Sequence, residues 1–582
     1  MKRILCLVLV LSVLIFGTAV TSAQDAPSGT FYGTWPYTLL PEHNLNAFVA
    51  TGGVNTNLGV LYRQMVEMPF GFYMWATDTW EPLLAESFGF TEDNSAYEVT
   101  INANANWSDG SPVTTEDVIA TYTIGRMLNW SDWNYLSAVE AVDDETVRFV
   151  FSGEPSKLAE RLILKTNIRA AATYGDIAGR AAELFESGAA SDSEEFAALR
   201  AELEAFRPEV LLVSGPFTYT LDDVGDSYMT LHWQPNSIFS DTVNFSEIRL
   251  WAGETDATTP LVLDGSIAHS TNVYPPATQQ AFAAAGIRLL IQPRMYGPAL
   301  LFNHAVEPWN VQEVRQAAAY VIERSENAFL TNGLGTTPTV YMAGLLDDSV
   351  PVLMNPEDID QLNRYEFDPE AAEELLMSVG YSRNDEGMWV DADGNTISAE
   401  YKYPAEFADF AGASLNAIDQ LNAFGFDIVG VAEPWQQAAE DIRTGSFDLS
   451  VWSWAGGSPF ASTQFFGPIQ RFNYVAFTDG RRGMDFPMDL EYNGEMINLD
   501  EMINNASNGL EVEVQRERAG EIALILNDLM PFVPLNIILS TEPWNESLIA
   551  GGPADDDPIL KNPSADHFVI WYMLNGIISP VE

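Results

Sequence analysis

The residues best suited to bind a ligand lie in the segment FDLSVWSWAGGSPFASTQFFG, which spans residues 447–467. Trp452 and Trp454 alternate along a predicted strand, so their side chains point to the same face. Gly456 and Ser458 follow in a turn that carries no charge. Flat aromatic faces beside hydrogen-bonding groups suit sugar rings, whose axial C–H faces stack while the hydroxyls take polar partners. The segment is therefore a candidate surface for an uncharged ring, such as that of a sugar.

No motif for catalysis or metal binding accompanies this segment. The sequence has no nucleophile elbow, phosphate-binding loop or paired zinc ligands. Its histidines are scattered, at His43, His232, His269, His304 and His567. We therefore expect no catalytic residue, no metal site and no cofactor. A secreted glycoside hydrolase stays open as an alternative, because two carboxylates at a suitable separation suffice for that chemistry and the chain holds 82 acidic residues.

The charge balance narrows the range of partners. The chain has 82 Asp and Glu residues against 27 Lys and Arg residues, which gives a formal net charge of −55. Such a surface repels nucleic acids and anionic membranes, so we expect neither as a partner. The acidic excess is compatible with a salty or acidic external medium, and equally with a surface that maintains solubility.

The N-terminal segment resembles a secretory signal peptide over residues 1–23. Lys2 and Arg3 precede an apolar run from Ile4 to Phe16, and small residues follow it. The single cysteine, Cys6, lies inside this segment, so the mature chain has no disulfide. We predict a secreted, periplasmic or cell-surface-associated protein after cleavage of this segment. An uncleaved N-terminal anchor is the alternative.

Helices and strands alternate along the rest of the chain. Asp368 followed by Pro369 predicts the start of a helix that stops at Gly380. Thr114 predicts another helix start, with Asp117 at the third helical position. Strands separated by helices predict an α/β architecture with largely parallel pairing. A chain of 582 residues is too long for one simple core, so two or more lobes are expected.

Several of these segments resemble family 5 of the bacterial extracellular solute-binding proteins. Residues 81–126 contain EPLLAESF and WSDGSPVTTEDV, which resemble the family patterns P-x-L-A-x-S-W and W-x-D-G-x-P-(F/V)-T-A-x-D-V. Three further segments resemble family patterns in family order, namely ALLFNHAVEPWNVQEVRQAAAYVIER, FDPEAAEELLMSVGY and DIRTGSFDLSVWSW. The family comprises oligopeptide-, dipeptide- and nickel-binding proteins of ABC importers. The resemblance spans nearly all of the chain after the signal segment.

The resemblance implies an α/β, two-lobed fold of the type II periplasmic-binding class, with an extra subdomain in the first lobe. We expect lobe 1 over residues 24–293, lobe 2 over residues 294–533 and a return to lobe 1 over residues 534–582. Two crossover segments, near 289–303 and 533–540, would form the hinge. The resemblance further implies a monomeric binding protein, not an enzyme, whose closed form is recognised by the membrane permease of an ABC importer.

One departure from the family pattern bears on the ligand. Peptide-binding members carry an aspartate three residues after the strand tryptophan, and it pairs with the α-ammonium group of the peptide. Here that position is Ala455. An ammonium group buried there would lose its charge partner, which is expensive. We therefore expect an oligosaccharide. An oligopeptide stays open as an alternative, but it would need another carboxylate in the cleft.

Other aromatic residues near the start of the chain resemble the branch of the family that binds cello-oligosaccharides and other β-oligosaccharides. In the family, Asn303 matches a residue beside the cleft, and we expect His304 to lie near the ligand as well. Tyr274 belongs to a loop that departs from the family pattern and is expected to line the cleft. The predicted ligand-binding residues are Trp35, Tyr37, Trp75, Tyr274, Asn303, Trp452, Trp454, Gly456 and Ser458.

Overall fold

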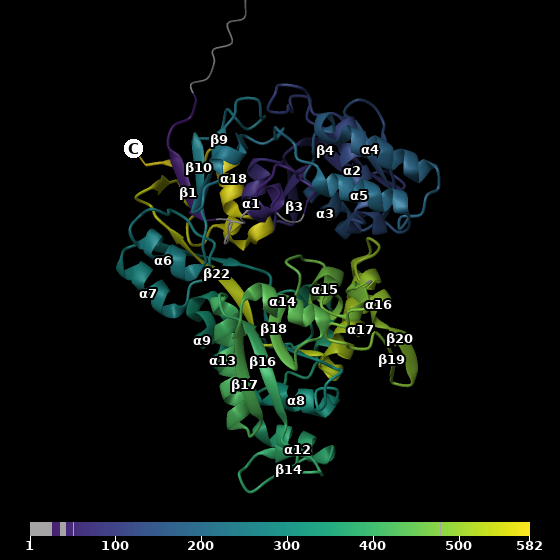
Figure 1. Cartoon of the computed structure of the whole chain (residues 1–582), viewed down its shortest axis with the longest axis vertical. Helices are drawn as coiled ribbons and strands as arrows, with labels where there is room; N and C mark the ends of the chain where they lie inside the picture. The colour runs from purple at the N-terminus through teal and green to yellow at the C-terminus, as the bar shows by residue number, and fades with distance from the viewer. Residues whose placement is uncertain (1–25, 35–41, 50–51, 478, 582) are drawn as a thin grey trace, which may run out of the picture.

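The chain folds into two lobes that lie one above the other in Figure 1. The structure is a computed structural model that describes residues 26–34, 42–49, 52–477 and 479–581. The predicted signal segment, Trp35 and Tyr37 lie outside these residues. Each lobe has its own hydrophobic core, one built mainly around Phe31 to Leu290 and the other around Ala299 to Leu535. The predicted two-lobed α/β fold is confirmed.

The first lobe contains two four-stranded sheets. One has the strand order β1-β10-β9-β8, with β1 (Thr30–Thr34), β10 (Glu247–Trp251), β9 (Tyr228–Trp233) and β8 (Phe217–Thr218). The other is antiparallel with the order β4-β5-β7-β6, formed by β4 (Ala85–Phe90), β5 (Ala96–Ile101), β7 (Thr146–Phe151) and β6 (Leu136–Ala141). Beside this second sheet lie the helices α2 (Thr115–Met127), α4 (Ala171–Glu186) and α5 (Glu194–Ala205). The last helix of the chain, α18 (Phe568–Leu574), returns to this lobe and completes its core.

The second lobe is built on one five-stranded sheet. Its order is β17-β16-β18-β12-β21, with β17 (Asp427–Glu433), β16 (Ser398–Pro404), β18 (Leu449–Trp454), β12 (Gly297–Phe302) and β21 (Phe532–Pro534). Strand β16 pairs parallel with β17 and β18, whereas β12 is antiparallel to β18 and β21. The predicted parallel pairing therefore holds for half of this sheet. The helices of this lobe include α8 (Gln312–Val321), α13 (Ala408–Ala423), α14 (Trp435–Thr444), α15 (Ala461–Arg471) and α17 (Val512–Leu529).

The chain passes between the lobes at a small three-stranded sheet. Strand β22 (Asn536–Trp544) pairs with β13 (Thr336–Pro338) through its first three residues and with β11 (Arg288–Pro293) through its last six. The passages run from β11 to β12 and from β21 to β22, and Figure 1 shows β22 between the two lobes. The predicted crossover segments, 289–303 and 533–540, contain these two passages. Strand β22 is thus a continuous element whose two ends contact different lobes.

Local capping chemistry sets the helix starts that the sequence predicts. The Asp368 carboxylate accepts hydrogen bonds from the backbone N–H groups of Glu370 and Ala371, both at 3.1 Å, and begins α12 (Pro369–Ser378). Thr114 and Asp117 form a capping box at the start of α2. These two predicted helix starts are confirmed. Within the described part of the chain, we find no helix that combines the length and the apolar character needed to span a membrane.

Candidate ligand-binding site

A cavity of ≈ 520 Å³ lies beside the passage from β11 to β12, at the edge of the second lobe. One wall comes from the start of α6 (Thr255–Leu263) and from the nearby loop that contains Asn272. The connection between β11 and β12 contributes Arg294 and Tyr296. The opposite wall comes from the start of α13, the end of β18 and helix α15 of the second lobe. Elements distant in sequence therefore converge on one space that is large enough for a small ligand.

Trp452 is the centre of an aromatic wall in this cavity. It lies on β18 with 8 % of its surface exposed. Its ring centroid is 5.8 Å from that of Phe410 and 6.3 Å from that of Phe407, and both phenylalanines also line the cavity. The Phe472 ring centroid also lies 5.8 Å from that of Trp452, in a T-shaped arrangement. Trp452 therefore lines the cavity, and its contact with a ligand stays a prediction.

Trp454 occupies a different position from the one predicted. It is fully buried in the core of the second lobe, and its indole Nε1 donates a hydrogen bond of 3.1 Å to the carbonyl oxygen of Asn536. The prediction that Trp454 forms a stacking surface is therefore wrong. Trp454 and Trp452 alternate along β18, as the sequence predicts. However, Trp454 is the last residue of the strand, and the start of β22 covers its indole.

The turn after β18 shapes the cavity through its backbone. Ala455 has a φ of 60°, in the left-handed region, and Gly457 has a φ of 63°. A side chain at Gly456 would place its Cβ 2.2 Å from the carbonyl oxygen of Thr463, so only glycine fits there. Ala455, Gly456 and Gly457 all line the cavity. Ser458 does not line it; this residue is buried, and its carbonyl oxygen accepts a hydrogen bond of 3.1 Å from Gln464 Nε2.

Three other predicted residues make structural contacts and do not line this cavity. Asn303 is buried, and its Nδ2 donates to the carbonyl oxygens of Gly445 and Phe447, at 3.1 and 2.7 Å, which holds the chain that leads into β18. Tyr274 is buried in a small apolar cluster, and its hydroxyl donates to Ser270 Oγ at 2.7 Å. The predictions for these two residues are corrected accordingly.

The third of these residues, Trp75, is half-buried in the first lobe. Its Nε1 donates to Asp566 Oδ2 at 3.1 Å, and the Arg161 guanidinium lies 5.3 Å from its ring centroid. His304, expected near the ligand, places its Nε2 3.0 Å from the carbonyl oxygen of Pro531 instead.

Charged residues in the cavity were not predicted from the sequence. Asp409, in the first turn of α13, accepts hydrogen bonds from the Tyr296 hydroxyl at 3.2 Å and from the Phe410 N–H at 2.9 Å. Burial raises the pKa of Asp409, although the charge of Arg294 opposes this. Glu254, at the start of α6, also lines the cavity. Burial, and then the charge of Asp409, raise the pKa of Glu254 to about 7. In the sequence, both residues resemble ordinary acids at helix N-termini.

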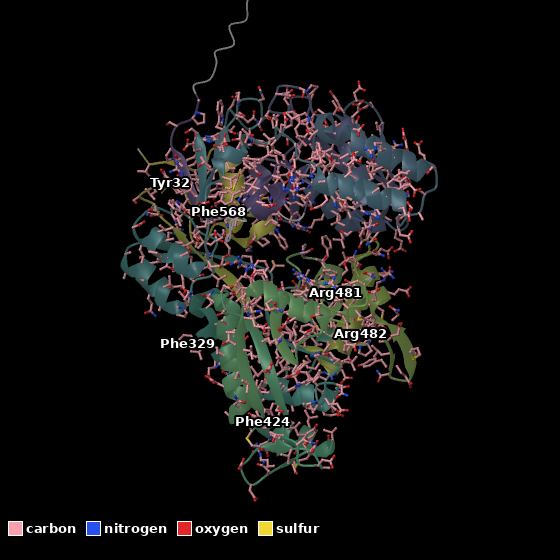
Figure 2. All side chains as sticks on the ribbon, in the orientation of Figure 1. Tyr32, Phe329, Phe424, Arg481, Arg482 and Phe568 are labelled. Atoms are coloured by element: carbon pink, nitrogen blue, oxygen red, sulfur yellow. The ribbon has the colours of Figure 1, made fainter. Side chains whose placement is uncertain are left out.

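A second buried polar group lies in the first lobe, at the end of β22. Glu542 Oε2 accepts hydrogen bonds from His269 Nε2 at 2.7 Å, His567 Nε2 at 2.9 Å and Gln292 Nε2 at 3.0 Å. The Phe568 ring, labelled in Figure 2, lies 4.7 Å from that of His567. The structure thus brings together two histidines that the sequence shows only as scattered residues.

This His–Glu–His group has the ligand types of a metal site. The three side chains offer ligand atoms within 4.8 Å of one another. However, His567 Nδ1 accepts a hydrogen bond from the Val569 N–H at 3.2 Å, so its Nε2 carries the proton that points at Glu542. The separations of 2.7 and 2.9 Å are hydrogen-bond lengths. Neutral donors therefore satisfy this buried carboxylate.

Solved structures show the same overall fold. The mannohexaose-bound periplasmic oligopeptide-binding protein of an oligopeptide ABC transporter from Thermotoga maritima is 20% identical, with a TM-score of 0.73 that covers 95% of this chain and 98% of that one. The oligopeptide-binding protein AppA from Bacillus subtilis, in complex with a nonapeptide, is 14% identical, with a TM-score of 0.68 over 96% of this chain and 100% of that one. These likenesses confirm the predicted type II periplasmic-binding fold.

Sequence comparison adds a curated relative and a family. The peptidoglycan-binding protein YepA from Agrobacterium fabrum is 32% identical over 130 residues, which are 20% of this chain and 20% of that protein. The sequence model for the middle region of the bacterial extracellular solute-binding proteins, family 5, matches residues 79–470. That range contains strand β18 with Trp452. It also contains the helices that line the cavity, apart from Arg471, which is the last residue of α15. The chain therefore belongs to family 5 of the bacterial extracellular solute-binding proteins.

Proposed function

We propose that this protein captures an oligosaccharide in the cavity around Trp452 and delivers it to the permease of an ABC importer. The observation that carries this proposal is the aromatic wall of Trp452, Phe407 and Phe410 next to Ala455. Peptide-binding members of the family have an aspartate at the position of Ala455. A sugar ring can stack on such a wall, and each aromatic contact contributes roughly 0.5–1.5 kcal/mol beyond area burial.

The relatives support a glycan as one ligand class of this fold. The Thermotoga maritima protein was solved with mannohexaose, although it is titled an oligopeptide-binding protein. YepA is named a peptidoglycan-binding protein. Binding in the family takes place between two lobes, and a ligand favours the closed state through its extra contacts in that state. We propose the same cycle here, with the protein acting as a monomer outside the cytoplasmic membrane after removal of residues 1–23.

An oligopeptide is the second candidate ligand, and one observation favours it. Glu254 and Asp409 place two carboxylates in the cavity, and either could take the role of the aspartate that is missing at Ala455. AppA, which was solved with a nonapeptide, has the same fold. A glycoside hydrolase, the alternative from another class, would need these carboxylates to flank a glycosidic bond. We propose binding without hydrolysis.

A ligand screen on residues 24–582 tests the proposal. Thermal unfolding would be followed with manno- and cello-oligosaccharides and with peptides of matched length. A ligand at a concentration 100 times its Kd stabilises the native state by about 2.7 kcal/mol, which is a measurable rise in Tm. We expect stabilisation by at least one oligosaccharide, and we expect its loss in Trp452→Ala. Stabilisation by peptides alone would overturn the oligosaccharide proposal, and release of sugars from the oligosaccharides would point to the hydrolase.

A further inference from the structure

The first lobe buries two arginines beside one glutamate. Arg63 begins the short 3₁₀ helix η1 (Arg63–Met65), and its Nε donates a hydrogen bond of 2.8 Å to Glu67 Oε2. Arg169 lies just before α4, and its Nε is 3.9 Å from Glu67 Oε1. The backbone N–H of Arg169 donates to Thr121 Oγ1 at 3.0 Å, which fixes this residue against α2. The two guanidinium groups therefore approach one carboxylate, each at a different oxygen atom.

Burial separates this group from bulk water. The side chain of Arg169 is 4 % exposed, that of Glu67 is 2 % exposed and that of Arg63 is 15 % exposed. Burial, and then the charge of Arg63, lower the pKa of Arg169 to about 10, so Arg169 stays charged at neutral pH. Two positive charges and one negative charge leave the group with an excess of one positive charge.

Aromatic rings cover the Arg169 guanidinium and supply no counter-charge. Its Cζ lies 4.3 Å from the ring centroid of Phe48 and 5.2 Å from that of Trp130. The segments on either side of Phe48 that lie outside the described residues, 35–41 and 50–51, contain no acidic residue in the sequence. The excess charge is therefore left without a carboxylate from this side of the lobe.

Three N–H groups of the two arginines also lack acceptors. In the part of the chain that the structure describes, Arg63 Nη2, Arg169 Nε and Arg169 Nη1 are buried and have no hydrogen-bond partner. The 3.9 Å between Arg169 Nε and Glu67 Oε1 is too long for a hydrogen bond. A buried donor without an acceptor is costly, and more so when it belongs to a charged group. Unpaired donors and excess positive charge thus occur in the same place.

We infer that Arg63 and Arg169 bind a monovalent inorganic anion, a halide such as chloride, inside the first lobe. One halide accepts hydrogen bonds from several N–H groups at once and neutralises the excess charge, and hydrogen bonds between two charged groups are strong. A divalent oxyanion would overcompensate the charge. A bridging water molecule is the alternative, but it would leave the charge in place. The inference does not depend on the ligand of the cavity around Trp452.

A crystal structure of the protein grown in sodium bromide is the direct test, because bromide gives an anomalous signal and water does not. We expect an anomalous peak in contact with Arg63 Nη2 and Arg169 Nη1. A water molecule at this position, or bromide bound only at exposed surface positions, would overturn the inference. This experiment uses the unmodified protein, so it stands even if a variant fails to fold.

Thermal unfolding in chloride and in gluconate, at equal ionic strength, separates specific binding from charge screening. Both salts screen alike, whereas chloride at ten times its Kd favours the folded state by an additional factor of about 11. We therefore expect a higher Tm in chloride, and no difference between the two salts in Arg169→Met. Arg180→Met is the matched control, because Arg180 pairs with Glu202 on the surface of α4, and it should retain the difference. Equal Tm values of the unmodified protein in both salts would overturn the inference.

A change at Glu67 distinguishes a bound anion from a bridging water molecule. Glu67→Gln removes the negative charge that repels the anion, so the Tm increase produced by bromide should reach half of its maximum at a concentration lower by at least about threefold. If a water molecule joins Arg169 to Glu67, Glu67→Gln should lower the Tm equally in bromide and in gluconate. That second result would overturn the inference and leave the proposed function untouched.

Discussion

The indole nitrogen of Trp454 donates a hydrogen bond of 3.1 Å to the carbonyl oxygen of Asn536, and this contact joins the end of β18 to the start of β22. The first residue of β12 lies in the same place, since a Cβ on Gly297 would come 1.8 Å from that carbonyl oxygen and 2.8 Å from the indole nitrogen. Asn536 in turn donates through Nδ2 to Asn327 Oδ1 at 2.9 Å. Trp454 thus fixes the start of β22 to the core of the second lobe.

Trp454→Ala should therefore act on stability. We expect the free energy of unfolding to fall by about 3–5 kcal/mol, because the change leaves a large cavity in a tightly packed region. The fraction that remains folded should bind ligand through an intact Trp452. Urea unfolding combined with calorimetry at low temperature measures both quantities. Unchanged stability together with a loss of affinity would show that Trp454 faces the ligand after all.

Trp452→Ala should lower ligand affinity as well as stability, because Trp452 lines the cavity and is also buried in the core of the second lobe. We expect glycan affinity to fall by at least about 1 kcal/mol, since the stacking face is removed, whereas Trp452→Phe should retain part of it. Trp75→Ala is the control, because Trp75 lies in the first lobe and does not line the cavity. A larger loss of affinity in Trp75→Ala than in Trp452→Ala would indicate that the ligand binds to the first lobe near Trp75.

The contrast between these tryptophans shows what the sequence can predict. The helix starts at Asp368 and Thr114 depend on neighbours within three residues, and the order of the family motifs predicts the two lobes. The environment of Trp454 depends instead on Asn536, which is 82 residues away, at a strand end that no local pattern marks. The alternation of side chains along a strand predicts on which face of the strand a residue lies, but it does not predict which other segment of the chain covers that face.

The charged groups were missed for the same physical reason. Glu254 and Asp409 are acids at helix starts, where acids are favoured in any protein. Their proximity follows from how α6 and α13 meet at the cavity, which is a property of tertiary packing. Likewise, His269 and His567 become neighbours only because β22 carries Glu542 between them.

Glu254 should make the stability of the protein depend on pH in neutral solution. Its pKa is raised from 4.5 to about 7, so the native state holds this proton more tightly than the unfolded chain does. The contribution of Glu254 to stability is therefore present at low pH and is lost as the pH rises through about 7. In the variant Glu254→Gln, this pH-dependent loss of stability should be absent. The Tm of the variant, relative to that of the unmodified protein, should rise between about pH 5 and pH 8, and a constant difference would contradict the assignment.

Glu542 should show the opposite dependence. Burial alone would raise its pKa, but the interactions with His567 and His269, whose Nε2 atoms donate hydrogen bonds to the carboxylate, hold the pKa of Glu542 below its usual range. Its contribution to stability is therefore present at neutral pH and is lost as the pH falls below about 4.5. At neutral pH, Glu542→Gln should lower the free energy of unfolding by about 1.5–3 kcal/mol, because the hydrogen bonds to a buried charge are lost.

The exposed Glu546 provides the control for this change. Its carboxylate pairs with Arg288 at 3.1 Å on the surface, and Glu546→Gln should cost less than about 1 kcal/mol. Equal losses in the free energy of unfolding for Glu542→Gln and Glu546→Gln, measured in urea at neutral pH, would show that the buried carboxylate stabilises the protein no more than the exposed one.

Salt should stabilise the protein as a whole. A net charge of −55 makes the folded chain repel itself. The Debye length falls from about 10 Å at 0.1 M to about 3 Å at 1 M salt, so this repulsion is screened. We expect the Tm to increase steadily across a titration with sodium chloride. A flat or falling Tm would indicate that the acidic residues are spaced widely enough to interact little.

The path of the chain through the two lobes has a consequence for the export that we propose. Phe31 and Tyr62 share a core with Val569 and Ile578, whereas the second-lobe core runs from Ala299 to Leu535 without a contribution from either end. During export in sequence order, all core residues of the second lobe therefore leave the translocon before the last core residues of the first lobe. The N-terminal part of the first-lobe core cannot pack completely until α18 has also been exported. Truncation at the C-terminus should consequently damage the lobe that contains the N-terminus.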